Sequence, residues 1–298
     1  MNFYYTYKAF GLTVRSEFEL LHWLPADKNV HASISIIQQK VDKINGTVLI
    51  ENSHYTLTTE GFNFSFKGNV FHYLHAERLL CVIRDYQNEV NFFQALYGPV
   101  FSVIAYFFHR IPLHASGIVL KDKTILISGN SGSGKSSIAW LLIQKAHARF
   151  FADDVTVLSK NDNVVMAHAA FPEIKLWNDM ATLYQLNKQN KIHPEVEKYF
   201  ISAEHFFVHD DFKPNAIVVI QTTPHHQPKI EPISGTEKFA LLYKHLYRKQ
   251  LTQKVFASLD FEILTMLAKQ ASIYLLHRPQ QVVEKEWTVF IADTFSNL

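Results

Sequence analysis

The sequence predicts an α/β protein with a phosphate-binding-loop (P-loop) core on a mixed sheet, and a β-rich N-terminal region before it. Three observations predict this fold. Short runs with period-two alternation occupy residues 1–90, and strand-like and helix-like runs alternate over residues 91–298. The stretch ISGNSGSGKSS at 127–137 places three of the ten glycines within six positions. We therefore expect two parts, 1–90 and 91–298, with the loop in the second.

Composition is that of a folded chain. Hydrophobic residues make up 48% of the sequence and charged residues 19%, and the formal net charge of +2 gives no strongly basic field for nucleic acid or an acidic membrane. The single cysteine, Cys81, excludes a disulfide within the chain. No signal-peptide pattern opens the sequence, so we expect a cytoplasmic protein with neither nucleic acid nor membrane as a partner.

The first 90 residues read as strands. LTVRSEFEL, ASISIIQQ, GTVLIEN and FNFSFKG are short and rich in β-branched or aromatic residues, with turn residues between them. The clearest alternation runs from Asn63 to Lys67, where Phe64 and Phe66 alternate with polar residues.

A helix is expected next. Apolar residues recur at three- and four-residue spacing from Phe92 to Phe107. The longest apolar stretch, 96–108, contains Gly98 and Pro99 and is shorter than the ~20 residues that span a bilayer. This pattern favours a buried core helix.

The remaining elements follow in order. We expect two strands in GIVLKDKTILISG, a helix in SSIAWLLIQKAHA, a returning strand in RFFA, a largely helical stretch from 178 to about 212, a buried strand in NAIVVIQ, helices near 238–247 and 261–270, a strand in SIYLLHRP and a last helix.

The glycine-rich stretch matches the pattern GxxxxGK[ST]. The matching residues and the serine that follows are Gly129, Asn130, Ser131, Gly132, Ser133, Gly134, Lys135, Ser136 and Ser137. Glycines let backbone N–H groups approach phosphate oxygens, the lysine reaches the β- and γ-phosphates, and the serine hydroxyl binds Mg²⁺. The alternative is a Gly/Ser linker, but an expected strand enters the stretch and an expected helix leaves it.

Two adjacent carboxylates, Asp153 and Asp154, lie 18 and 19 residues after Lys135. A helix of about 12 residues carries the chain ~18 Å from the loop. The RFFA strand can return it to the same edge of the sheet. One carboxylate can then hold Mg²⁺ and the other can accept a proton from an attacking hydroxyl. The alternative is a solvated turn at a strand end.

The segment HASGIVLKDKTILISGNSGSGKSSIAWLLIQKAHARFFADDVTVL resembles the catalytic core of HPr kinase/phosphorylase. This bacterial serine kinase family has a P-loop core related to phosphoenolpyruvate carboxykinase. The early Ala152-Asp153-Asp154 distinguishes this pattern from ordinary P-loop NTPases. KAFGLTVRSEFEL, PEIKLW and LLHRP extend a looser similarity to short relatives, some of which lie in biosynthetic clusters for ribosomally made peptides, including lasso peptides.

The resemblance implies roles for particular residues. Lys135 and Ser136 would bind phosphates and Mg²⁺, Asp153 would be the general base, and Asp154 would lie on the magnesium side, although these two roles could be reversed. His114 matches a family histidine near the transferred phosphate; the alternative is a strand-start histidine held by hydrogen bonds.

Two more assignments follow from the resemblance. The family's later signature, with a magnesium-binding Glu in a Gly-containing loop, is absent from this sequence, which leaves the reverse phosphorylase activity in doubt. Glu173 is the nearest acidic candidate for that metal ligand. Arg248 could reach a phosphate from a late loop, or it could be a solvated helix end.

The resemblance implies an ATP- and Mg²⁺-dependent serine kinase acting on a peptide or small protein, with a homo-oligomer possible. Two alternatives stay open. One is a kinase for a small molecule such as an amino acid or sugar, and the other is a nucleotide-binding regulator that transfers no phosphate.

Overall fold

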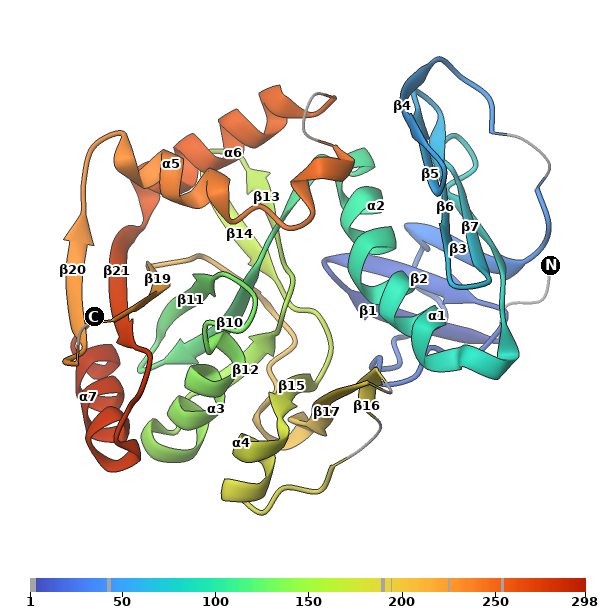
Figure 1. Cartoon of the computed structure of the whole chain (residues 1–298). Helices are drawn as coiled ribbons and strands as arrows, with labels where there is room; N and C mark the ends of the chain where they lie inside the picture. The colour runs from blue at the N-terminus through green and yellow to red at the C-terminus, as the bar shows by residue number, and fades with distance from the viewer. Residues whose placement is uncertain (1–3, 42–43, 189–190, 194, 225, 253–254) are drawn as a thin grey trace.

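The computed structural model describes residues 4–41, 44–188, 191–193, 195–224, 226–252 and 255–298. Figure 1 shows an N-terminal sheet on one side, an α/β core on the other, and a helical segment between them. The chain is thus a mixed α/β protein whose two largest sheets contain both parallel and antiparallel strands.

The N-terminal sheet has the strand order β1-β2-β3-β8-β7-β6-β5-β4 over the described residues. Most neighbours are antiparallel, but β3 runs parallel to both β2 and β8. The strands are β1 (Tyr5–Ala9), β2 (Leu12–Ser16), β3 (Ile34–Gln38), β4 (Val48–Asn52), β5 (Tyr55–Thr58), β6 (Gly61–Phe66), β7 (Asn69–Leu74) and β8 (Leu79–Ile83). The alternating run from Asn63 to Lys67 lies mostly in β6, so the strand expected there is confirmed.

A continuous helical segment lies between the sheet and the core. It comprises the 3₁₀ turn η1 (Tyr86–Asn88), α1 (Glu89–Ala95), the π-helical turn η2 (Leu96–Val100) and α2 (Phe101–Phe107). The span Glu89–Phe107 is long and apolar enough to cross a membrane by composition alone, but 83% of its most apolar window is buried inside the protein. The expected core helix is confirmed, with a π turn around Pro99, which has no N–H to donate.

The core contains a sheet with the order β12-β10-β11-β19-β21-β20. Its strands are β10 (Ala115–Leu120), β11 (Lys123–Gly129), β12 (Arg149–Ala152), β19 (Ala216–Thr223), β20 (Lys229–Ile233) and β21 (Ser272–Pro279). β11, β19 and β21 are parallel neighbours, whereas β10 and β20 run antiparallel to theirs. The two strands expected in GIVLKDKTILISG are present and pair as a hairpin, and the returning RFFA strand is present as β12.

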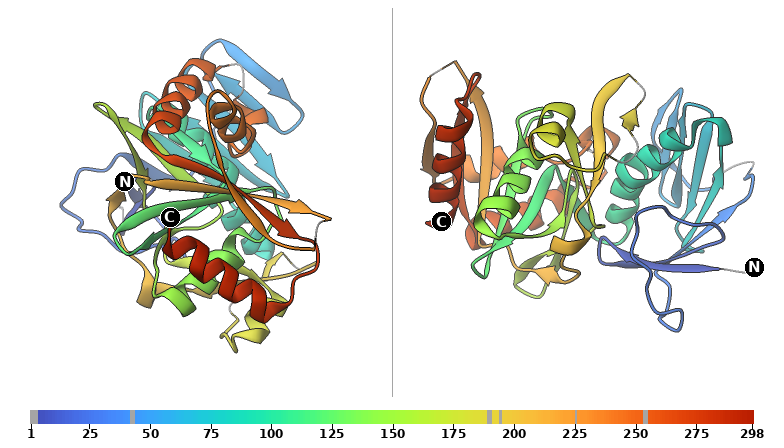
Figure 2. Two further views of the ribbon diagram at one scale, coloured as in Figure 1. Left: turned by 90° about the vertical axis from the view of Figure 1, so that its left-hand side faces the viewer. Right: turned by 90° about the horizontal axis from the view of Figure 1, so that it is seen from below.

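Helices cover both faces of this sheet, as Figures 1 and 2 show. They are α3 (Lys135–Ala146) and α7 (Glu284–Ser296) on one face, and α5 (Glu237–Lys244) and α6 (Ala257–Gln270) on the other. Successive residues of β11 alternate between the faces: Ile125 and Ile127 pack with α3 and α7, and Leu126 packs with α5 and α6. A strand buried on both sides therefore has consecutive apolar residues, as Ile125, Leu126 and Ile127 of β11 show.

Two smaller sheets complete the core. One has the order β18-β14-β13-β9 and the other β15-β17-β16. The elements are β9 (Arg110–Leu113), β13 (Thr156–Asn161), β14 (Val164–His168), β15 (Glu173–Trp177), α4 (Asn178–Leu183), β16 (Lys191–His193), β17 (Val196–Ser202), η3 (Glu204–Phe206), β18 (Asp211–Phe212) and η4 (Lys249–Leu251).

The prediction of a largely helical stretch from 178 to about 212 is wrong. Only α4 and the short turn η3 are helical among its described residues, and β16 and β17 occupy much of the rest. β17 pairs antiparallel with the whole of β15, from Lys198 to Ser202. This pairing gives its alternating residues a strand partner that the local sequence does not reveal.

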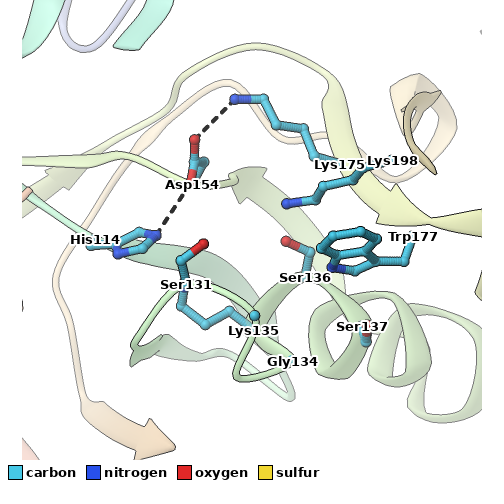
Figure 3. Close-up of a pocket in the computed structure, with 11 residues that line it drawn as sticks. His114, Ser131, Gly134, Lys135, Ser136, Ser137, Asp154, Lys175, Trp177 and Lys198 are labelled. Atoms are coloured by element: carbon cyan, nitrogen blue, oxygen red, sulfur yellow. Dashed lines mark hydrogen bonds and ion pairs between the residues drawn. The ribbon is translucent and has the colours of Figure 1, made fainter. Parts of the chain in front are cut away.

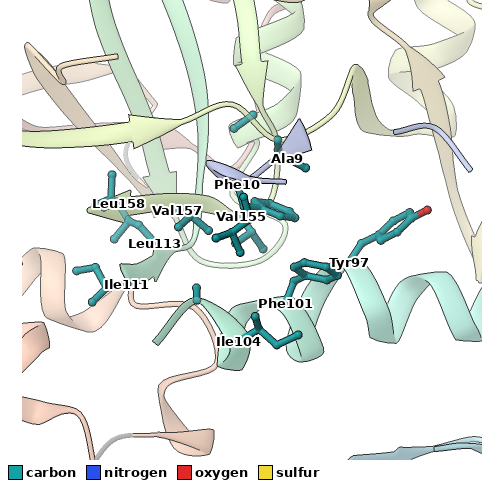
Figure 4. Packing of buried hydrophobic residues seen from close by; sticks show 14 of the residues in the cluster. Ala9, Phe10, Tyr97, Phe101, Ile104, Ile111, Leu113, Val155, Val157 and Leu158 are labelled. Carbon is teal, nitrogen blue, oxygen red and sulfur yellow. The ribbon is translucent and has the colours of Figure 1, made fainter. Parts of the chain in front are cut away.

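The N-terminal sheet and the core share one hydrophobic cluster. Figure 4 shows Phe10 of the N-terminal region packed with Phe101 of α2 and Val155 of the core. Trp23 lies within 5.0 Å (ring centroids) of Phe101 and 6.2 Å of Phe171. The two parts are therefore joined by a continuous apolar core.

Candidate active site

The glycine-rich loop connects the end of β11 to the first turn of α3. Gly129 has φ +149°, and a Cβ there would lie 2.9 Å from the backbone oxygen of Ile220 on the neighbouring strand. Gly134 has φ +103° immediately before the helix. Side chains other than glycine are strained at such angles, so these two positions need glycine. The loop thus ends at the N-terminus of α3, where unpaired backbone N–H groups and the helix dipole favour an anion.

Lys135 is 6% exposed at the start of α3. Its Nζ donates hydrogen bonds to the backbone oxygens of Gly129 and Asn130, both at 3.1 Å. Burial lowers the pKa of Lys135 to about 8, although Asp154 and Asp153 act in the opposite direction. An anionic ligand beside Lys135 would raise this pKa again.

Ser133 Oγ is buried and has no hydrogen-bond partner among the described residues. Such an orphaned hydroxyl inside a glycine-rich cradle fits a ligand with oxygen acceptors.

A β-bulge brings the two aspartates to the loop. β12 pairs with β10 through Gly117–Ala152 and Ile118–Phe150, which leaves Phe151 as the extra residue. Because β12 and β11 both run antiparallel to β10, their carboxyl ends meet at one edge of the sheet. Asp153 and Asp154 follow β12 at that edge, as the expected return strand requires.

Asp153 is 5% exposed, and three donors use its carboxylate. Ser116 Oγ and Ser136 Oγ donate to its Oδ1 at 2.6 and 2.8 Å. The backbone N–H of Lys175 donates to its Oδ2 at 2.9 Å. The carboxylate is therefore fixed against the serine of the glycine-rich loop.

Asp154 points into the open site, with φ +67°. Its Oδ1 lies 3.2 Å from His114 Nε2 and its Oδ2 lies 3.0 Å from Lys175 Nζ (Figure 3). Burial alone would raise the pKa of Asp154, but Lys175 and His114 outweigh it and hold this pKa well below its usual range. Asp154 is thus an ionised acceptor at neutral pH.

A small pocket, called here the loop pocket, lies between the glycine-rich loop and Asp154. It is lined by His114, Ser131, Gly132, Gly134, Lys135, Ser136, Ser137, Asp154, Lys175, Trp177 and Lys198. Three lysines, Lys135, Lys175 and Lys198, therefore line a space beside the loop, which is an environment for phosphate groups.

Sequence reasoning missed Lys175, Trp177 and Lys198. Glu173, Lys175 and Trp177 alternate along β15, so all three lie on one face of the strand. The alternation in PEIKLW was the available signal. Lys198 gave no such signal, because it reaches the pocket only through the pairing of β17 with β15.

Glu173, the expected metal ligand, does not line the loop pocket. It is 4% exposed, and its Oε1 lies 2.6 Å from Nδ1 of His22 in the N-terminal region. Burial raises the pKa of Glu173, with His22 acting against it. The structure therefore places Glu173 in a link between the N-terminal region and the core.

Arg248, expected to bind the nucleotide, lies elsewhere in the site. It lines a cavity of about 460 Å³, called here the aromatic cavity, that adjoins the loop pocket on the Asp154 side. His114, Ser131, Asp154, Lys175 and Lys198 line both spaces. Asn130 is exposed and contributes the backbone oxygen that Lys135 contacts.

A third cavity, of about 600 Å³, adjoins the opposite side of the loop pocket and is called here the tryptophan cavity. Gly132, Gly134, Ser137 and Trp177 line both spaces. Trp287, Tyr184 and Arg278 lie farther along its walls. Arg278 Nη1 also donates to the backbone oxygen of Ser133 at 3.3 Å, which ties this cavity to the loop.

The residues present fit Mg²⁺. The Ser136 hydroxyl and the Asp153 carboxylate are adjacent oxygen ligands, which this hard cation prefers. Over the residues that the structure describes, no group of three or more His, Cys, Asp or Glu side chains could hold a metal. Mg²⁺ at a nucleotide site commonly takes one or two protein oxygens and completes its shell with phosphates and water.

Comparisons with known proteins give a distant likeness to solved structures. No protein-family model matches the sequence, and no curated protein matches it significantly. Among solved structures, the HPr(Ser) kinase/phosphatase from Coxiella burnetii is similar over 62% of this chain and 88% of that chain, with 13% identity and a TM-score of 0.35.

Proposed function

We propose that this chain is an ATP-dependent kinase that transfers the γ-phosphate to a serine hydroxyl of a peptide or small protein. The observation that carries the proposal is the order of the three adjoining spaces. The tryptophan cavity, the loop pocket and the aromatic cavity follow one another, with Asp154 between the last two. This order suits a nucleoside, its phosphates and a phosphate acceptor.

The nucleoside would occupy the tryptophan cavity. Trp177 is 44% exposed at the junction with the loop pocket, where an indole ring offers a face for a base. The phosphates would lie on the loop backbone and Lys135. Mg²⁺ would lie beside Ser136 and Asp153 and would neutralise charge on the phosphate oxygens.

The acceptor hydroxyl would enter from the aromatic cavity and meet Asp154. Its oxygen forms a bond to the γ-phosphorus while the bond from that phosphorus to the β–γ bridging oxygen breaks, and ADP leaves. The hydroxyl proton passes to the Asp154 carboxylate. Lys135, Lys175 and Lys198, which line the loop pocket, would stabilise charge on the equatorial phosphoryl oxygens.

The geometry favours the reverse of the aspartate roles that the resemblance first implied. Asp153 already accepts three hydrogen bonds and does not line the loop pocket or the aromatic cavity, whereas Asp154 lines both. We therefore assign the magnesium side to Asp153 and the base to Asp154. His114 holds Asp154 in position.

Serine and peptide as the acceptor are supported by the sequence resemblance, and a cytoplasmic location is proposed on the same ground together with the single buried cysteine. A peptide also suits the size of the aromatic cavity, because pockets of ~300–1,000 Å³ hold ligands much larger than free serine.

The test is transfer of label from γ-labelled ATP to serine peptides, with free serine and sugars assayed in parallel. We expect label on peptide serine in wild type. Lys135→Ala should weaken ATP binding more than about tenfold, since a charged hydrogen-bond donor to phosphate is lost. Label on the metabolites alone would show that the acceptor is a small molecule. ATP binding without any transfer would show a nucleotide-binding regulator instead of a kinase.

A further inference from the structure

The aromatic cavity has walls from both parts of the chain. Phe64 and Phe66 of β6 come from the N-terminal sheet, Phe93 from α1, and Phe200 from β17. Phe64 and Phe66 are half-buried, so their rings are shared between the core and the cavity. Part of the lining of this cavity is therefore built from aromatic rings that the proposed phosphoryl transfer itself does not use.

The charged side chains that line the cavity are mostly positive. Arg248, Lys175 and Lys198 are cationic, and Asp154 is the acid among the lining residues that the structure describes. Lys175 is paired with Asp154 at 3.0 Å, so Arg248 and Lys198 leave the cavity with an excess of positive charge. Lys198 also lines the loop pocket, where phosphate would meet it. Arg248 lines the aromatic cavity and is absent from the loop pocket, so it can pair with a carboxylate of the acceptor.

One further polar atom lacks a partner. Gln94 lines the cavity, and its side-chain oxygen is buried with no hydrogen bond among the described residues. A buried amide oxygen is stabilised when it accepts from an N–H group, and the backbone of an extended peptide supplies such donors. Aromatic walls, one unpaired acceptor and an excess of positive charge thus occur in one cavity.

We propose that the aromatic cavity selects the acceptor peptide by its flanking residues. The peptide carries an aromatic or large aliphatic side chain beside the phosphorylated serine, which packs against Phe64, Phe66 and Phe93, and an acidic side chain that pairs with Arg248. This inference rests on the proposed kinase function and deepens it. It also gives the N-terminal sheet a role in substrate choice, since two of the rings belong to it.

The test is a degenerate peptide library with one fixed serine, incubated with Mg²⁺ and γ-labelled ATP and sequenced after capture of phosphopeptides. We expect aromatic and large aliphatic residues at a flanking position to be enriched about tenfold over glycine, in keeping with the burial of one large side chain. Phe66→Ala should remove most of that enrichment. Arg248→Gln should remove the enrichment of acidic residues and leave the aromatic preference.

Phe108→Ala is the matched control. Phe108 is another half-buried phenylalanine packed against the same core cluster, and it does not line the aromatic cavity. This variant should keep the wild-type preferences. An unselective wild type, or a Phe66→Ala variant with unchanged enrichment, would overturn the inference while the kinase assignment stands. ATP binding without label on any library peptide would also overturn the inference about peptide selection. A wild-type protein that binds no ATP would overturn the proposed function itself.

Discussion

Asp153 and Asp154 are neighbours in sequence but have different environments. The left-handed conformation of Asp154, with φ +67°, turns the chain sharply after β12, and aspartate tolerates this region better than most residues. One carboxylate is thereby held against Ser136 and the other faces His114 and Lys175. The sequence predicted that both carboxylates reach the loop. Their division could not be predicted, because it depends on this single backbone angle and on Lys175 from a distant strand.

The two aspartates can be separated by kinetics. Asp154→Asn should lower kcat by about 10²–10⁴-fold with ATP affinity nearly unchanged, because a proton acceptor is lost. Asp153→Asn should instead raise the Mg²⁺ concentration for half-maximal rate about tenfold or more, because the ligand beside Ser136 is weakened. Both are measured as initial rates against Mg²⁺ at saturating ATP. The opposite pattern would restore the first assignment, with Asp153 as the base.

At the scale of elements, the local pattern predicted the β11–loop–α3 unit and the return strand β12. The pairing of β15 with β17 was not predicted, because both strands depend on partners far apart in the chain. This pairing supplies Lys175 and Lys198, so the missed elements are also the source of the missed site residues. The bulge between β10 and β12 did leave a signal in the sequence. Gly117 lies within the strand HASGIVL, and a glycine within a strand often marks a bulge or a close approach.

Gly117→Ala should destabilise the fold by about 1–3 kcal/mol, because overpacking forces a buried group to move. An added Cβ would overlap the ring of Phe151, which is fully buried in the bulge of β12. Chemical denaturation monitored by circular dichroism measures the free energy of unfolding. The matched double variant, Gly117→Ala with Phe151→Leu, should lose less than the sum of the two single variants. Strict additivity would mean that the ring is not what the new methyl group meets.

At the scale of the molecule, the predicted boundary near residue 90 separates two sequence patterns, while the hydrophobic cluster crosses it. Phe10, Trp23 and Tyr97 pack in the same cluster as Val155 and Phe171. Period-two alternation shows which residues of a strand are buried, but it does not show against which element they pack. The shared core could therefore not be predicted from the sequence.

Residues 91–298 expressed alone should not fold cooperatively, because they would expose the apolar face that the N-terminal sheet covers. Size-exclusion chromatography and near-ultraviolet circular dichroism test this, and co-expression of 1–90 with 91–298 as separate chains should restore a folded complex. A sharp thermal transition for 91–298 alone would show that the core is an independent domain.

Stability should also depend on pH through Asp260 in α6. Asp260 is 1% exposed and accepts a hydrogen bond from Tyr106 of α2 at 3.0 Å. Burial raises its pKa from 3.8 to about 6, against the effect of the Tyr106 hydrogen bond. The folded state then binds the proton more tightly than the unfolded state, so this group's contribution to stability is present below pH 4 and is lost as pH rises through 6.

Asp260→Asn has no carboxyl group to ionise, so it removes the loss of stability that occurs as the pH rises. It keeps an oxygen acceptor for the Tyr106 hydroxyl. The stability of the variant relative to wild type should increase by about 1–2 kcal/mol between pH 4.5 and pH 7.5, in keeping with the cost of a buried charge. Urea denaturation at the two pH values measures the difference. An equal difference at both values would place the pKa of Asp260 outside this window.

The shared core has a consequence for motion. Domains that close over a substrate rotate about a seam with few contacts. Here the two walls of the aromatic cavity are joined through the packed rings of Trp23, Phe101 and Phe171. The pair of half-buried His22 and buried Glu173 crosses the same boundary. The walls therefore move as one body. Under the proposed kinase function, a phosphorylated product would leave by diffusing along the cavity, and the width of that passage would limit the size of the side chains that enter it.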